Sequence, residues 1–197
     1  VSLAQIFGVS FSVIILLAGV GFILDVEFSR LTVILLLGMF ALLALDGLLR
    51  KGIRLQRRDW PKLVIGLLLL GGAIAWRLYQ ARDLLLPPWV DSQHHYLIVR
   101  AMLEARGLPH DLSPYLPVPF YYHYGYHALA ALFTALSGLP IGEAMLALGQ
   151  VLNAAIGLST YALGKALWRN WRPALAAALL VSFATRMPAY YLSWGRY

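Results

Sequence analysis

Five apolar segments long enough to cross a lipid bilayer constrain this chain more than any other feature. The hydrocarbon core of a bilayer is about 30 Å thick, so a spanning helix needs about 20 apolar residues. Because lipid offers no partner to the backbone, such segments must be helical or closed into a barrel. We therefore predict an all-α integral membrane protein with about five transmembrane helices, at residues 3–24, 31–49, 63–81, 143–165 and 173–189.

Charged side chains are scarce and unevenly placed. They make up 13% of the 197 residues, about half of the roughly 25% found in soluble domains, whereas apolar residues make up 60%. Six of the 16 basic residues lie between Arg50 and Lys62, so the net charge of +7 does not indicate a nucleic-acid partner. The chain has no cysteine, which excludes disulfides and thiolate metal sites.

The basic segment 50–62 sets the predicted orientation. Loops rich in Lys and Arg stay in the cytoplasm, so the helix at 63–81 delivers residues 82–142 to the external side. A second basic cluster, at 165–172, is expected in the cytoplasm as well. These features predict an integral membrane protein with loop 50–62 cytoplasmic and ectoloop 82–142 external. We expect its membrane to be a bacterial or archaeal cell membrane.

Residues 126–137 form an apolar stretch of only about a dozen residues. If this stretch crossed the bilayer, the basic cluster at 165–172 would lie outside, against the positive-inside tendency. Its length is also typical of re-entrant or interfacial segments. We therefore predict a helix here that does not span.

A second short helix is predicted over residues 92–106 of the ectoloop. Its apolar residues recur at helical spacing, Ser92 is its expected N-cap, and Gly107-Leu108-Pro109 ends it. Prolines then hold the next segment extended, at Pro114, Pro117 and Pro119. The ectoloop is thus expected to contain two short juxtamembrane helices joined by a rigid, tyrosine-rich segment.

All the histidines of the chain fall within this ectoloop, at His94, His95, His110, His123 and His127. Adjacent residues point about 100° apart on a helix, so only one of His94 and His95 is expected to meet Asp91. His123 and His127 have the i, i+4 spacing at which two imidazoles bind one ion on a helix face. The structural alternative is an aromatic and histidine belt at the lipid headgroups.

Asp91 is the candidate catalytic carboxylate. It follows Pro87-Pro88-Trp89 at the outer end of the 63–81 segment, which places it at the membrane surface. There it can coordinate a divalent cation such as Mg²⁺ or Mn²⁺, or act as a base toward an acceptor hydroxyl. The alternative is that Asp91 only caps the helix that follows.

The remaining features have simpler expected roles. Glu104 and Asp111 are either solvated charges or a second acid of the site. Arg77 and Arg82, near the outer end of their helix, are expected to extend toward lipid phosphates. Small residues at 149–164 predict close packing of one helix against another.

The ectoloop resembles the first external loop of the GT-C superfamily of glycosyltransferases. The resemblance rests on Asp91-Ser-Gln-His94-His95-Tyr, Gly107-Leu-Pro and Tyr122-His123-Tyr-Gly125-Tyr-His127-Ala-Leu. It covers residues 63–197, which would form a GT-C-like core, whereas 1–62 would add two helices and a basic loop. Such enzymes have a second external acidic motif and further helices beyond this point, so the resemblance implies a fragment of a longer enzyme.

The resemblance implies that the protein transfers a sugar from a polyprenyl-phosphate donor in the bilayer to an acceptor on the external face. By it, Asp91 corresponds to the acidic residue of the first loop, either catalytic or cation-binding. Arg196 is a candidate to neutralise the departing lipid phosphate. The remaining substrate-binding residues it indicates are His94, His95, His123, Tyr124 and His127.

Two other classes of protein fit the same residues. The chain could be a non-catalytic transmembrane subunit or scaffold, packed against other membrane subunits. It could also handle a metal ion, which for zinc requires three histidines within about 2.0–2.1 Å of the ion. The surroundings of the Asp91 carboxylate distinguish the transferase from the scaffold. If Asp91 shares a cavity with His94 or His123, the transferase is favoured. If Asp91 only caps its helix and faces solvent, a scaffold is favoured.

Overall fold

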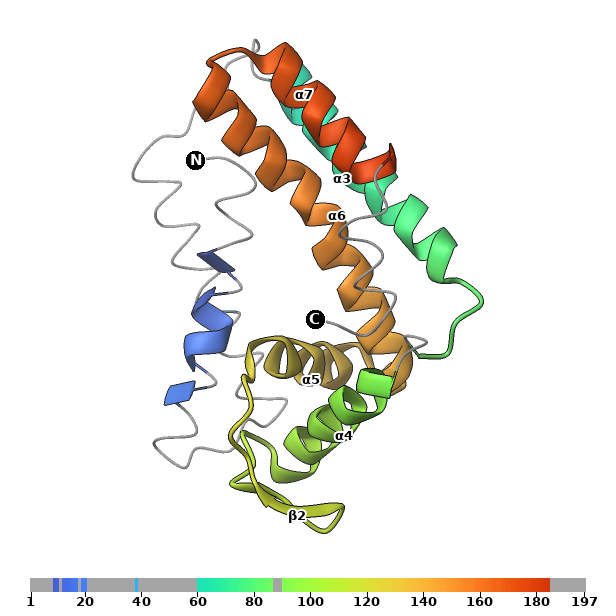
Figure 1. Cartoon of the computed structure of the whole chain (residues 1–197), viewed down its shortest axis with the longest axis vertical. Helices are drawn as coiled ribbons and strands as arrows, with labels where there is room; N and C mark the ends of the chain where they lie inside the picture. Colours follow the sequence, from blue (N-terminus) through green and yellow to red (C-terminus); the bar gives the residue numbers. More distant parts are fainter. Residues whose placement is uncertain are drawn as a thin grey trace.

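The computed structural model describes residues 9–10, 12–17, 19–20, 38, 60–86 and 90–184, which are mostly helical (Figure 1). The helix predicted at 31–49 and most of the one at 3–24 lie outside the described residues. So do loop 50–59 and Arg196. The five predicted spans are therefore visible only in part.

Two of the described helices are long and apolar enough to cross a membrane. They are α3, Trp60–Ala81, and α6, Ile141–Trp168, so the helices predicted at 63–81 and 143–165 are confirmed and each is longer than expected. A third helix, α7, Trp171–Leu179, continues into the π-helical turn η2, Leu180–Ala184. The turn between α6 and α7 is tight because the Asn170 side chain accepts a hydrogen bond from the Arg172 N–H (3.0 Å) and caps α7.

Helices α3 and α7 each pack along α6 (Figure 1). The close approach predicted for residues 149–164 is confirmed, because a Cβ atom at Gly157 would collide with the Ser182 hydroxyl of η2. Gly164 likewise lies against the backbone of Ala174. The buried core between the three helices consists of Leu69, Leu70, Ala73, Ala154, Leu158 and Ala178.

The outer surface of α3 is apolar. Only 22% of its stretch Val64–Ala81 is buried, and Leu68 is 70% exposed. A core helix of a soluble protein would bury such side chains, whereas lipid accepts them. At one end of the bundle the exposed aromatics Trp60, Trp168 and Trp171 gather, as expected at a membrane–water interface.

Arg77 does not extend toward lipid phosphates as predicted. It is buried between α3 and η2, where its guanidinium donates hydrogen bonds to the carbonyls of Ser182 (2.8 Å) and Val181 (3.4 Å). These bonds join the middle of the chain to η2, which lies more than 100 residues further along the sequence. Arg82 is exposed but turns back onto α3, stacking on the Tyr79 ring at 4.0 Å.

The segment between α3 and α6 lies at the opposite end of the bundle from these tryptophans (Figure 1). It contains α4, Val90–Ala105, strands β1, Asp111–Leu112, and β2, Leu116–Pro119, and helix α5, Gly125–Ser137. With 13 residues, α5 is about 20 Å long, so the predicted short helix is confirmed. Its length is too small to cross a bilayer.

Two details of this segment differ from the sequence predictions. Helix α4 begins at Val90, so Ser92 is a buried residue of its first turn and not the N-cap. The proline-rich segment is also more than an extended connection, because β1 and β2 pair as an antiparallel hairpin. Asp111 stabilises its turn, since its carboxylate accepts a hydrogen bond from the Ser113 N–H (2.9 Å).

Helix α4 is buried on two faces, which fixes its position. One face joins α5 and α6 in a core of Val99, Leu129, Ala130, Met145 and Leu148. The other face lies under the hairpin, in a cluster of Ile98, Ala101, Met102 and Leu112. Side chains carried by the first two turns of α4 are therefore held on a rigid support.

Replacing Gly142 with alanine should destabilise the junction of α3, α4 and α6. A Cβ atom there would lie 2.6 Å from the backbone oxygen of Leu85, which cannot rotate away. We expect the free energy of unfolding to fall by about 1–3 kcal/mol, measured by thermal unfolding in detergent. As a control, Gly71→Ala on α3 meets nothing within 4 Å and should raise it by about 0.5–1 kcal/mol. Equal effects of the two substitutions would contradict this prediction.

Candidate functional site

A cavity of about 420 Å³ opens between the start of α4 and the end of the hairpin. Its polar groups come from α4, and its other walls are apolar or aromatic. This volume lies in the range of pockets that bind small molecules. The residues that line it are Asp91, His94, His95, Ile98, Leu112, Val118, Pro119, Phe120, Tyr121 and Tyr122.

The α4 residues reach the cavity because of their helical spacing. Asp91, His95 and Ile98 recur at i, i+4 and i+7 and share one face. Only one of the adjacent histidines was expected to meet Asp91, but both line the cavity. They differ in environment: His94 is exposed, and His95 is 4% exposed.

Asp91 lies in the first turn of α4 and is half-buried. A carboxylate is stabilised there by the helix dipole, as the capping alternative supposed. The structure nevertheless places it on a cavity wall together with His94, and not on an open surface. This is the arrangement that favours a site over a simple helix cap.

His95 reaches back from the cavity to His127 of α5. Its Nδ1 lies 2.7 Å from Nε2 of His127, which is fully buried. The other ring nitrogen of His127, Nδ1, lies 3.1 Å from the backbone oxygen of His123. The two histidines therefore form a buried hydrogen-bonded pair across 32 residues of sequence.

The prediction that His123 and His127 share one helix face is wrong. Helix α5 begins only at Gly125, so the two residues do not share a helix face, and their ring centroids are 6.3 Å apart. The His123 ring instead stacks on Tyr122 at the surface, with centroids 4.0 Å apart. Both ring nitrogens of His127 have hydrogen-bond partners, one on the His95 ring and the other at the His123 carbonyl.

The predicted substrate-binding residues thus fall into different places. His94 and His95 line the cavity, and His127 lies directly behind His95. Tyr124 packs against the cluster under the hairpin and is absent from the cavity wall. The predicted substrate-binding residues did not include Phe120, Tyr121 and Tyr122, which also line the cavity. The aromatic run that follows the prolines could have indicated them.

No group of three or more His, Asp or Glu residues converges anywhere in the part of the chain that the structure describes. The metal-handling reading therefore has no complete set of ligands there. Asp91, His94 and His95 are the His and Asp side chains on the cavity wall. That Asp91 binds a divalent cation stays a prediction, because Mg²⁺ is often held by one or two carboxylates together with water and substrate phosphates.

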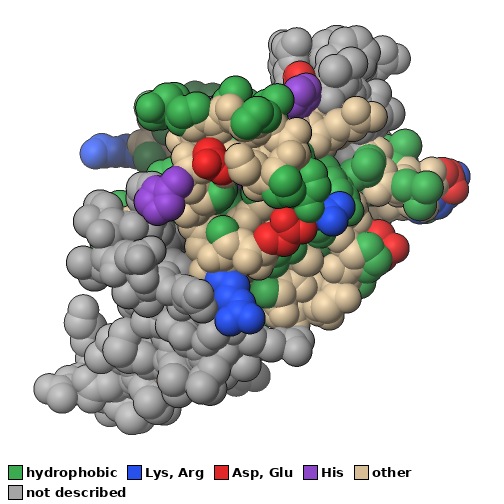
Figure 2. All heavy atoms as spheres, turned by 90° about the horizontal axis from the view of Figure 1, so that it is seen from below, with side chains coloured by type: hydrophobic (Ala, Val, Ile, Leu, Met, Phe, Trp, Pro, Cys, Tyr) green, Lys and Arg blue, Asp and Glu red, His purple; other side chains and the backbone are tan. Residues whose placement is uncertain are grey.

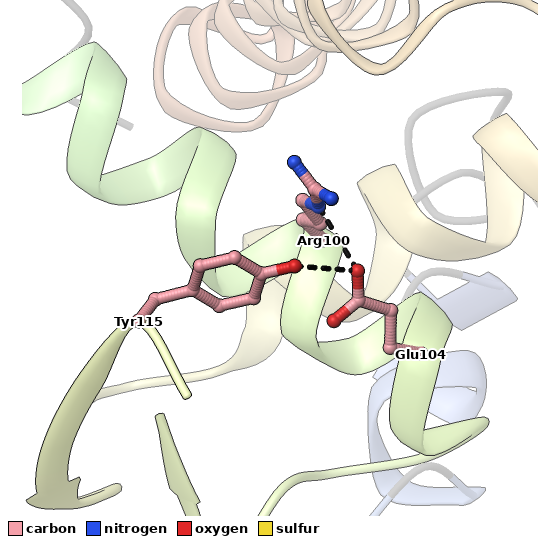
Figure 3. A network of polar contacts seen from close by, with 3 residues as sticks. All are labelled: Arg100, Glu104 and Tyr115. Carbon is pink, nitrogen blue, oxygen red and sulfur yellow. Dashed lines mark hydrogen bonds and ion pairs between the residues drawn. The ribbon is translucent and has the colours of Figure 1, made fainter. Parts of the chain in front are cut away.

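Neither candidate second acid belongs to the cavity. Glu104 lies at the far end of α4, where its carboxylate accepts hydrogen bonds from the Tyr115 hydroxyl (2.7 Å) and from Arg100 Nε (2.9 Å) (Figure 3). These bonds, Tyr115 first, hold the pKa of Glu104 below its usual value. The network ties the hairpin to α4, and Asp111 serves the hairpin turn. Figure 2 shows acids and histidines reaching this end of the molecule between apolar side chains.

Burial keeps His127 neutral. Desolvation, followed by the nearby His95, lowers the pKa of His127 to about 3, against a smaller opposing effect of its bond to the His123 carbonyl. An imidazole with such a pKa carries no charge near neutral pH. The His127 ring is therefore uncharged in its hydrogen bond with His95.

Acidification should destabilise the fold through His127. Between its folded pKa of about 3 and its ordinary value of 6.5, the unfolded chain binds more protons than the folded chain. The free energy of unfolding therefore falls as the pH falls through this window, by at most about 1.4 kcal/mol per pH unit. Thermal unfolding at about pH 7 and about pH 4.5 should show a weaker pH dependence for His127→Gln than for the wild type. The same dependence in both proteins would contradict the assignment.

A family model described as "Family of unknown function (DUF6541)" matches residues 7–197. No curated protein and no solved structure matches the sequence.

Proposed function

Since the chain belongs to the DUF6541 family, whose description assigns no activity, we propose from the geometry of the site that it is part of a membrane glycosyltransferase. The enzyme transfers a sugar from a lipid-phosphate donor. The observation that carries this proposal is the shared cavity of Asp91, His94 and His95, with aromatic walls. It lies at the end of two helices that are able to cross a membrane.

The proposed membrane placement follows from the two ends of the bundle. The start of α3 and the turn between α6 and α7 lie at the same end (Figure 1), so the basic residues near both belong to one side. By the positive-inside tendency this side is cytoplasmic. Helices α4 and α5 and the hairpin are then external. Together with α7–η2 and the segments at 3–24 and 31–49, α3 and α6 make up the five proposed spans.

The cavity suits a sugar. Aromatic rings offer stacking faces to the apolar side of a pyranose, and Phe120, Tyr121 and Tyr122 form one wall. Asp91 and His95 on the opposite wall supply polar contacts. Its position at the proposed external surface brings it to the level at which the phosphate of a lipid donor lies.

The proposed reaction is an inverting displacement. The Asp91 carboxylate accepts the proton of the acceptor hydroxyl while the hydroxyl oxygen bonds to the anomeric carbon of the donor sugar. The bond from that carbon to the phosphate oxygen breaks, and the lipid phosphate leaves with the bonding electrons. Positioning of the two reactants supplies much of the rate. Arg196, which lies outside the described residues, is the proposed counter-charge of the leaving phosphate.

A photoreactive polyprenyl phosphate tests this assignment, because that group is common to every donor of the class. The full chain in lipid nanodiscs is irradiated with the probe, and labelled peptides are mapped by mass spectrometry. We expect labelling of residues 91–122 that unlabelled polyprenyl phosphate suppresses and the matching polyprenol does not. Labelling confined to the lipid-facing side of α3, equal for phosphate and alcohol, would overturn the proposal.

That second outcome would favour the alternative, a non-catalytic transmembrane subunit. The observation behind this alternative is the apolar outer surface of the bundle, where Leu163, Leu167 and Leu180 are exposed. Another membrane subunit, as well as lipid, could cover such a surface. Co-purification of a partner bound along α6 and α7 would support it.

A further inference from the structure

We propose that the turn between α6 and α7 binds the headgroup of an anionic phospholipid through Lys165, Arg169 and Arg172. This turn lies at the opposite end of the bundle from α4 and α5 (Figure 1), so the inference goes beyond the proposed sugar transfer. The two proposals share only the placement of the helices in a membrane. In that placement the bound lipid belongs to the cytoplasmic leaflet.

Positive charge at this turn is not balanced by acids nearby. The stretch from Lys165 to Arg172 contains three basic residues and no acidic one, and all three basic residues are exposed. None of them forms an ion pair within the part of the chain that the structure describes. The acids described there all belong to residues 83–143, toward the other end of the bundle (Figure 1). The turn therefore presents a cationic surface that suits an anion.

Helical spacing and the tight turn bring these charges together. Lys165 lies one turn beyond Tyr161, which packs against the core between the three helices. Arg169 follows Lys165 by four residues and ends α6, where its N–H donates to the Lys165 carbonyl (3.0 Å). Asn170 then caps α7 and fixes Arg172 in the first turn of that helix. Because like charges four residues apart repel each other, an anion that contacts both removes an unfavourable interaction.

Helix dipoles explain only part of this arrangement. The C-terminal end of α6 favours cations, which accounts for Lys165 in its last turn. The N-terminal end of α7 favours anions instead, yet its first turn contains Arg172 and no acid. A phosphate group bound here contacts the positive end of the α7 dipole as well as the basic side chains. The charge that α7 itself lacks is then supplied by the ligand.

The apolar surroundings favour a lipid over a soluble anion. Trp60 begins α3, Trp168 ends α6 and Trp171 begins α7, and each ring is about half exposed. Tryptophan at helix ends is typical of the headgroup level of a bilayer. The last two turns of α6 also expose Leu163 and Leu167. A phospholipid uses both kinds of surface, because its phosphate meets the basic residues and its acyl chains meet the apolar ones.

Titration of the full chain with lipid in a neutral detergent, followed by native mass spectrometry, measures the binding. The probes are phosphatidylglycerol, which is anionic, and phosphatidylcholine with the same acyl chains, which has no net charge. We expect phosphatidylglycerol to bind at least about tenfold more tightly, because each basic residue near an anionic headgroup contributes about fivefold in affinity. Equal affinities for the two lipids would overturn the proposal.

Arg169→Gln tests the site, and Arg106→Gln is its matched control. Both arginines are exposed and follow a helix with a left-handed backbone, each with a φ of 52°, but Arg106 follows α4 at the other end of the bundle. We expect Arg169→Gln to weaken phosphatidylglycerol binding about fivefold and to leave phosphatidylcholine binding unchanged. Arg106→Gln lies beyond the screening distance and should change neither affinity by more than about a factor of two. Equal losses in both variants would indicate attraction by net charge alone and would contradict the proposed site.

Soluble glycerol phosphate distinguishes a lipid from a free phosphate. It carries the charged group without acyl chains, so at equal concentration we expect it to leave bound phosphatidylglycerol in place. Displacement under these conditions would show that the turn is a site for soluble phosphates and would reject the lipid. None of these measurements involves the Asp91 cavity or its substrate. A failure here therefore leaves the transferase proposal intact, and a failure of polyprenyl-phosphate labelling leaves this site intact.

Discussion

Replacing Asp91 with asparagine should lower the rate of sugar transfer by about 10²–10⁴-fold, the usual contribution of a positioned base. Asparagine keeps the size of the side chain and its place on the cavity wall but cannot accept a proton at neutral pH. The measurement is the release of lipid phosphate from polyprenyl-phosphate sugars by the full chain in proteoliposomes. Binding of the photoreactive probe should change much less than the rate.

The matched control is Asp111→Asn. Asp111 is an exposed carboxylate of the same segment between α3 and α6, and it supports the hairpin turn. It should leave the transfer rate within about a factor of two, because surface substitutions cost at most about 0.5 kcal/mol. If the two variants lost activity equally, Asp91 would be a structural residue and the reaction would need another base.

Substitution of Arg77 by methionine should lower the free energy of unfolding by about 1.5–3 kcal/mol, the range for hydrogen bonds made by charged groups. Methionine fills most of the space but removes the hydrogen bond to the Ser182 carbonyl (2.8 Å) and the longer one to the Val181 carbonyl (3.4 Å). Because these carbonyls lie where water is scarce, the penalty is retained. Thermal unfolding of the purified protein in detergent measures the loss.

Arg82→Met provides the comparison on the same helix. Arg82 is exposed, and its contacts with Tyr79 and Asp83 are local, so the expected change is within about 0.5 kcal/mol. A loss at Arg82 as large as that at Arg77 would show that α3 depends on its positive charge in general. It would not support a specific role of the hydrogen bonds from Arg77 to η2.

Local pattern was enough to predict the helices but not their ends. Length and apolar content identified α3, α6 and the short α5, because a helix satisfies its own backbone and needs no distant partner. The start of α4 was misplaced by two residues, since Ser92 is a good N-cap by type and only burial shows that it lies inside the helix. The β1–β2 hairpin was missed because its strands are short and its prolines resemble an extended linker.

The sequence grouped Asp91 with His94 and His95, which line one cavity, but it did not predict how the histidines pair. Asp91 and His94 could be grouped from helical spacing, whereas His95 and His127 are 32 residues apart and meet only because α4 packs on α5. The i, i+4 rule suggested His123 as the partner of His127. That rule applies only inside a helix, and α5 starts at Gly125, two residues after His123. Arg77 was misjudged for a similar reason, since its partners come from a segment more than 100 residues away.

The aromatic ends of α3 have a consequence for the lipid that this protein needs. Trp60 and Tyr79, both exposed, stand about 28 Å apart along the helix axis, close to the thickness of an average hydrocarbon core. A bilayer with longer or shorter acyl chains creates hydrophobic mismatch, which a helix relieves by tilting. Because α3 is locked to α6 and α6 carries α4 and α5, tilting would move the Asp91 cavity relative to the phosphate plane. If the proposed function holds, acyl-chain length should therefore tune how easily the proposed lipid-phosphate donor reaches this cavity.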